Sequence, residues 1–178
     1  VKRGLTKEVA NDIFQDMTSF ASYGFNKSHT AAYGLVAYRT AYLKVKYPKE
    51  FMAAILPSVI GDEGKTNIYV NECNRLNIPV IPPHINKSSE SYTVTENSVV
   101  FSLLGIKNIG RGLIRRIETE RKENGLFKSY WDFCKRVYST ELNRRALECL
   151  IKAGALDGLG LNRREMLLNL DIAITAAA

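Results

Sequence analysis

A long run without proline between two turn signals most constrains this chain. Residues 30–47 contain no proline and a single glycine, Gly34, and Pro48 follows directly. Because the residue before a proline is driven out of the α region, the run predicts a long helix that ends at Tyr47. Ser28 is a favourable N-cap, since its hydroxyl can accept from the free N–H groups of the first turn. Most of the run is apolar, which predicts a helix buried against a large surface.

The start of this helix has the features of a phosphate site. A helix N-terminus offers free N–H groups and the positive end of its dipole, and Lys27 and His29 would lie beside it. On a helical wheel, Arg39 and Lys46 share one stripe with Ser28. A solvated basic residue near a helix end, or an arginine in a structural ion pair, is the alternative interpretation.

The charge of the chain favours a polyanionic partner. Its 25 Lys and Arg exceed its 18 Asp and Glu, which gives a formal net charge of +7. A basic domain without a nucleic-acid partner has the same composition.

The three cysteines are far apart and the two histidines do not cluster with them, which argues against a zinc site. The odd number of cysteines favours a reduced cytoplasmic protein. No apolar run reaches the length of a membrane span, which is about 18 residues.

Shorter elements are expected around the long helix. Thr6 can cap a first helix, in which four apolar residues would face a core: Val9, Ile13, Met17 and Phe20. Another helix is expected at 50–56, and a third one after the cap residue Thr66. Residues 80–85 should be extended, because Pro82 and Pro83 remove backbone donors.

A polar segment and two β-rich runs follow. Residues 86–91 are typical of a linker, and the runs 92–95 and 99–102 predict a small hairpin. Since an isolated hairpin is only marginally stable, this one must pack on neighbouring helices.

A tight turn between apolar residues is the second informative pattern. The segment 103–117 resembles a helix-hairpin-helix motif, with a short helix, a turn at 108–110 and a second helix that begins near Gly112. The N–H groups of such a turn can bind a DNA phosphate without reading sequence. The predicted DNA-binding residues are Lys107, Asn108, Gly110, Arg111, Gly112 and Arg115.

Two residues are expected to shape this turn. Asn108 stands where the motif usually has glycine, and asparagine tolerates the left-handed region. Gly110 is expected to need a conformation that a side chain would hinder. An ordinary helical hairpin that touches no DNA is the alternative.

The C-terminal part predicts a second, degenerate copy of this geometry. Helices are expected at 129–137, with Trp131 packed inward, and from Thr140 onward. After a turn at 153–158, Asn162 can cap a last helix that runs from Arg163 to Ile174.

Several ordered blocks of the chain are similar to one protein family. From about Thr6 to about Leu170, the chain resembles the fingers and helix-hairpin-helix regions of bacterial replicative DNA polymerase III alpha subunits. The main blocks are Phe25-Asn26-Lys27-Ser28-His29-Thr30-Ala31-Ala32-Tyr33, Tyr47-Pro48-Lys49-Glu50-Phe51, Ile81-Pro82-Pro83-His84-Ile85-Asn86-Lys87-Ser88, Gly105-Ile106-Lys107-Asn108-Ile109-Gly110 and Leu150-Ile151-Lys152-Ala153-Gly154-Ala155.

The resemblance implies a mainly α fold in three parts. These would be a fingers-type helical subdomain at 1–86, a linker and the start of a β-hairpin at 87–98, and a tandem helix-hairpin-helix module at 99–178. The chain would contribute to template-directed DNA synthesis by binding the incoming deoxynucleoside triphosphate and template–primer DNA. The nucleotide-binding residues would be Asn26, Lys27, Ser28, His29, Arg39 and Lys46. Other replisome subunits would be partners through the parent chain.

The carboxylates of the chain do not make a polymerase metal site. Such a site needs carboxylates that hold two metal ions about 4 Å apart. Asp12 and Asp16 share a helical face, but nothing places a third carboxylate beside them. In the family the catalytic aspartates belong to the palm, so Mg²⁺ is expected in the parent polymerase. No catalytic residue, metal or cofactor is therefore expected in this chain. We expect the chain to be a piece of a longer protein and to extend no primer on its own.

Two other classes of function remain open. A stand-alone, non-specific DNA-binding module would explain the charge and the hairpin, but not the block from Phe25 to Tyr47. A protein-interaction scaffold is the other class.

Sliding-clamp peptides of this family resemble Gln-x-x-Leu-Phe. The only glutamine, Gln15, does not begin such a peptide, so contact with a sliding clamp is expected beyond Ala178.

Overall fold

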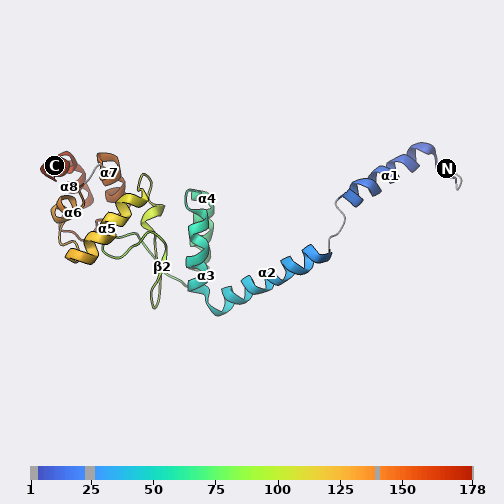
Figure 1. Ribbon diagram of the computed structural model, residues 1–178, viewed down its shortest axis with the longest axis horizontal. Coiled ribbons are helices and arrows are strands. Elements are labelled where there is room, and N and C mark those ends of the chain that lie inside the picture. Colours follow the sequence, from blue (N-terminus) through green and yellow to red (C-terminus); the bar gives the residue numbers. More distant parts are fainter. Residues whose placement is uncertain (1–3, 23–26, 139–140, 178) are drawn as a thin grey trace. The chain divides into compact units, whose positions relative to one another are not determined.

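The computed structural model describes residues 4–22, 27–138 and 141–177 (Figure 1). The chain divides into two units, Val1–Tyr42 and Leu43–Ala178. The boundary expected at 87–98 falls inside the second unit and stays a prediction. The fold is mainly α, as the sequence predicts.

The first unit consists of helix α1 (Lys7–Ser22) and most of helix α2 (Lys27–Lys46). The predicted cap of α1 is confirmed, because Thr6 Oγ1 accepts from the Val9 N–H at 3.3 Å. Ser28 lies within the first turn of α2, so its prediction as the N-cap is wrong. The described helix begins one residue earlier, at Lys27.

The apolar faces of these two helices are exposed. The predicted core residues of α1 have exposed fractions from 44% at Val9 to 74% at Phe20. In α2, Leu35 and Val36 are also about half exposed, at 49% and 55%. The prediction that both helices are buried is therefore wrong for this chain. Periodicity shows that a face is apolar, but the face is buried only where another surface covers it.

The second unit begins with short elements around a small sheet. They are α3 (Pro48–Ile55), the 3₁₀ turn η1 (Leu56–Val59), α4 (Glu63–Arg75), β1 (Val80–Ile81), β2 (Thr93–Val94) and β3 (Val99–Val100). The strand order is β1-β3-β2, with β2 antiparallel and β1 parallel to β3. The predicted hairpin is confirmed. The pairing of β1 was not predicted, because a strand of two residues has no periodicity.

The cap of α4 differs from the prediction. Asp62 Oδ1 accepts from the Lys65 N–H at 3.0 Å, so Asp62 is the N-cap. Thr66 lies inside the helix and donates its hydroxyl to the Val59 carbonyl at 3.2 Å. At the other end of α4, Glu72 pairs with Lys44 at 2.6 Å and with Arg75 at 2.7 Å.

The remaining elements form the helical module. They are the 3₁₀ turn η2 (Leu103–Gly105), α5 (Arg111–Asn124), α6 (Tyr130–Val137), α7 (Arg144–Lys152), α8 (Arg163–Leu168) and α9 (Leu170–Ala177). The predicted last helix is interrupted at Asn169. The predicted start at Thr140 lies outside the described residues, and α7 begins after its cap Asn143. Trp131 is 41% exposed, so its prediction as a core residue is wrong.

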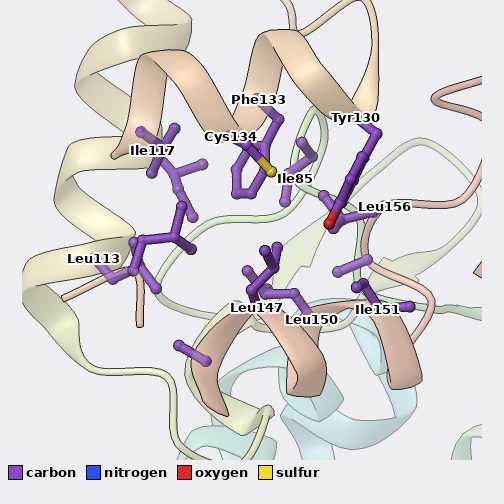
Figure 2. Close-up of a cluster of buried hydrophobic side chains, with 14 of the residues drawn as sticks. Ile85, Leu113, Ile117, Tyr130, Phe133, Cys134, Leu147, Leu150, Ile151 and Leu156 are labelled. Atoms are coloured by element: carbon purple, nitrogen blue, oxygen red, sulfur yellow. The ribbon is translucent and has the colours of Figure 1, made fainter. Parts of the chain in front are cut away.

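Two hydrophobic cores hold the second unit together. The smaller core contains Met52, Ala53, Leu56, Cys73, Ile78, Tyr92 and Val99. In the larger core, side chains from three helices and two loops point toward one another (Figure 2). They include Leu113 and Ile117 of α5, Phe133 of α6, Leu147 and Leu150 of α7, and Ile85 and Leu156.

We predict that Leu150→Ala destabilises the module by about 2–5 kcal/mol, because it leaves a cavity among fully buried side chains. Leu168, which is 74% exposed, supplies a matched control whose change to alanine should cost less than about 0.5 kcal/mol. Urea unfolding followed by circular dichroism measures both. Equal losses for the two variants would contradict the assigned core.

The three cysteines should differ in reactivity. Burial raises the pKa of the Cys134 thiol to about 12, and burial also raises the pKa of the Cys73 thiol. Both thiols are therefore protonated at pH 8, while Cys149 is only partly buried. In the native protein, a disulfide reagent should modify Cys149 first and reach Cys73 and Cys134 only after denaturation. Equally fast modification of all three would contradict this order.

Candidate nucleic-acid interface

The turn between η2 and α5 is held from two sides. Asn108 has φ 62°, which confirms the left-handed conformation predicted for it. Ile109 is only 6% exposed and belongs to the larger core. The Asn108 amide donates to Cys149 Sγ of α7 at 3.2 Å. The turn is therefore fixed by a buried side chain and by a hydrogen bond to another helix.

Gly110 has an ordinary conformation. Its φ of −93° and ψ of 161° suit any residue, and a Cβ added there would meet no atom within 4 Å. The prediction that Gly110 needs a conformation reserved for glycine is wrong. The left-handed residue of the turn is Asn108, two positions earlier.

Gly110 occupies the N-cap position of α5. It has no side chain that could accept a hydrogen bond from the N–H groups of the first turn. The neighbouring helices are capped: Ser129 accepts from Asp132 N–H at 3.1 Å, and Asn143 accepts from Ala146 N–H at 3.0 Å. The N-terminus of α8 has a capping box: the Asn162 side chain accepts from the Glu165 N–H, and the Glu165 side chain accepts from the Asn162 N–H. Among α5, α6, α7 and α8, α5 is thus the helix whose cap residue offers no side-chain acceptor, so an anion from outside the helix could cap its first turn.

Basic side chains surround this turn. Lys107, Arg111 and Arg115 are all exposed, as the sequence predicts. Arg111 Nε lies 2.9 Å from Glu90 Oε1, and their side chains are 66% and 33% exposed. A pair this open to solvent is weak, so a phosphate can compete with Glu90 for the guanidinium.

A second carboxylate lies against the first turn of α5. A Cβ added to Gly112 would come within 2.0 Å of Glu141 Oε1, so glycine at this position leaves room for the Glu141 side chain. A negative charge here interacts favourably with the helix dipole. Sequence reasoning missed both Glu90 and Glu141, because neither lies near the turn in sequence and no local pattern marks them.

The described members of the predicted nucleotide-binding set lie along α2. Asn26 lies outside the described residues, and the side chain of Lys27 is not described. Ser28, His29 and Arg39 are exposed on α2, and the His29 ring lies 4.2 Å from the Tyr33 ring. At 1.5 Å per residue, Ser28 and Arg39 are about 17 Å apart along the helix.

Lys46, the last member of the set, is exposed and belongs to the second unit. The nucleotide site stays a prediction.

Among residues 4–22, 27–138 and 141–177, no helix is long and apolar enough to cross a membrane. Nor do three or more His, Cys, Asp or Glu side chains group there as metal ligands.

Comparison with known proteins agrees with this geometry. The family described as "Helix-hairpin-helix motif" matches residues 77–166, about half of the chain. The chain belongs to the helix-hairpin-helix family. The matched range includes the turn at Asn108, the whole of α5 and the first residues of α8.

The chain is also similar, over nearly its whole length, to DNA polymerase III alpha subunits. It is 45% identical to the protein of Thermus aquaticus over 177 residues, which are 99% of this chain and 14% of that relative. It is 43% identical to the Borreliella burgdorferi protein over 171 residues, 96% of this chain and 15% of the relative. The family resemblance is confirmed, and the chain spans about one seventh of the length of these relatives.

The conformation of Asn108 can be tested by two substitutions. Both Asn108→Gly and Asn108→Ala remove the hydrogen bond to Cys149, but only alanine places a Cβ in the left-handed region. We expect the alanine variant to be less stable than the glycine variant by about 1 kcal/mol in urea unfolding. An alanine variant as stable as the glycine variant would contradict the conformation of the turn.

Proposed function

We propose that this chain is the part of a replicative DNA polymerase that binds the DNA backbone and assists in binding the incoming nucleotide. The backbone contact is assigned to the turn at Asn108 and the first turn of α5. The proposal for the whole protein is template-directed DNA synthesis in the reduced cytoplasm, with Mg²⁺ and the catalytic carboxylates supplied by other parts of a longer polypeptide. Deoxynucleoside triphosphate and other replisome subunits are proposed partners.

The N-terminus of α5, whose N-cap residue Gly110 has no side-chain acceptor of its own, is the observation that carries the DNA contact. It occurs in a helix-hairpin-helix module, and exposed Lys107, Arg111 and Arg115 lie on or beside it. Backbone N–H groups and guanidinium groups bind phosphate oxygens, which are the same at every base pair. The contact is therefore proposed to be independent of DNA sequence.

Similarity over the whole chain favours a polymerase over a stand-alone DNA-binding module. A helix-hairpin-helix module alone accounts for residues 77–166. It leaves α1 and α2 without a role, although the polymerase alpha subunits match 99% of the chain. The exposed apolar faces of these helices also suit a piece that packs on a larger protein.

The DNA contact is tested by the salt dependence of binding. Each phosphate that is neutralised contributes about −0.9 to the slope of log affinity against log salt. We expect Arg115→Ala to reduce the size of this slope by about one, equally on unrelated DNA sequences. Arg111→Ala should reduce it by less, because Glu90 already neutralises part of the Arg111 charge. Fluorescence anisotropy with labelled duplex DNA at several salt concentrations measures the slopes.

Arg75→Ala is the matched control for the Arg111 substitution. Arg75 is also an exposed arginine in an ion pair, with Glu72, but it lies at the end of α4. Its removal should leave the slope unchanged. If Arg115→Ala folds, as judged by circular dichroism, and keeps the wild-type slope, the proposed contact is wrong.

The nucleotide site requires the full-length polymerase. There, Lys27→Ala should raise the KM for deoxynucleotide if Lys27 neutralises triphosphate charge, or lower kcat if the contact forms only in the transition state. Lys7→Ala, at the start of α1, is a matched control that should change neither constant. Unchanged kinetics with reduced stability would show that Lys27 has only a structural role.

A further inference from the structure

A cavity of about 610 Å³ lies beside the hairpin turn. One side is formed by the loop before α4 and by its first turns, at Gly61, Glu63 and Asn67. The other side is formed by η2 and the segment that leads to Ile109. This volume falls within the range of ligand pockets, which is roughly 300–1,000 Å³.

The lining combines aromatic rings with polar side chains. The rings of Tyr92 and Phe101 meet edge to face with centroids 4.9 Å apart. Glu63, Asn67 and Lys107 are exposed and supply acceptors and donors. A nucleobase has this same combination of apolar faces and polar edges.

The cavity and the hairpin share part of the chain. Lys107, Asn108 and Ile109 line the cavity and also form the turn whose N–H groups and charge are proposed to bind phosphate. A DNA strand that has one phosphate bound at the turn therefore has its neighbouring nucleotide at the cavity. Within a duplex the bases are stacked and paired, so only an unpaired base can enter.

We propose that this cavity binds an unpaired nucleobase of a DNA strand whose phosphate is held at the hairpin. This inference rests on the proposed DNA-binding function and adds a second contact to it. The Asn67 amide meets the polar edge of the base, and the rings of Tyr92 and Phe101 cover one of its faces. The chain thereby distinguishes DNA with a single-stranded extension from blunt duplex.

The test compares two DNAs that differ only in bases. Both are duplexes with the same short single-stranded extension, but one extension consists of abasic nucleotides. Since both carry the same number of phosphates, the backbone contributes equally to their affinities. The 178-residue chain should bind the DNA with intact bases about tenfold more tightly in fluorescence anisotropy.

Asn67→Ala should reduce this ratio by about fivefold, because the polar edge of the base loses its partner. Asn74→Ala is the matched control, since Asn74 is an exposed asparagine on the same helix that does not line the cavity. It should leave the ratio unchanged.

A wild-type ratio near one, with the salt slope still dependent on Arg115, would overturn the cavity proposal and leave the proposed DNA contact intact. A wild-type ratio near one without that dependence would overturn both. A tenfold ratio that survives Asn67→Ala would also overturn the proposal, because the base would then be bound elsewhere on the protein.

Discussion

Burial of Ile109 fixes the geometry on which the proposed DNA contact depends. The side chain inserts into the larger core, and the left-handed residue Asn108 before it reverses the chain. Gly110 then caps α5 at a defined place on the surface. Because the core also contains Leu113 and Ile117 of the same helix, the direction of α5 is set by packing and not by the turn alone.

The absence of a side-chain cap on α5 has an energetic meaning. Replacing a capping side chain by alanine typically costs a helix about 1 kcal/mol of stability, and replacing it by glycine costs only a few tenths of a kcal/mol. Helices α6 and α7 have that stabilisation from Ser129 and Asn143. At α5, a phosphate is proposed to bind the N–H groups of the first turn in competition with the Glu141 carboxylate, which lies against Gly112. A negative charge at this position interacts favourably with the helix dipole.

Local signals in the sequence predicted part of the local structure, although Ser28 and Thr66 lie inside their helices and are not the expected caps. The caps at Thr6 and Asn162 and the turn at Asn108 each follow from a few neighbouring residues, and all are present. The β2–β3 hairpin and the mainly α fold were also predictable. These features depend on hydrogen bonds and backbone preferences within a short segment, which a sequence displays directly.

Features that depend on distant residues could not be predicted. The ion pair of Arg111 with Glu90 joins segments 21 positions apart, and the Glu141 side chain reaches Gly112 from beyond α6. The exposure of Phe20 and Val36 depends on which surface covers them, and periodicity shows only that a face is apolar. The prediction that Gly110 has a conformation reserved for glycine was wrong, because a glycine in a turn does not show which of the turn residues has positive φ.

The central claim is that the first turn of α5 binds phosphate, and backbone amide shifts test it most directly. Duplex DNA titrated into ¹⁵N-labelled protein should shift the amide signals of residues 109–113 at the lowest DNA concentrations. The capped first turn of α8, residues 163–166, is the internal control and should shift little. If the α5 amides stay unchanged while other regions respond at saturating DNA, the hairpin is not the site of DNA contact.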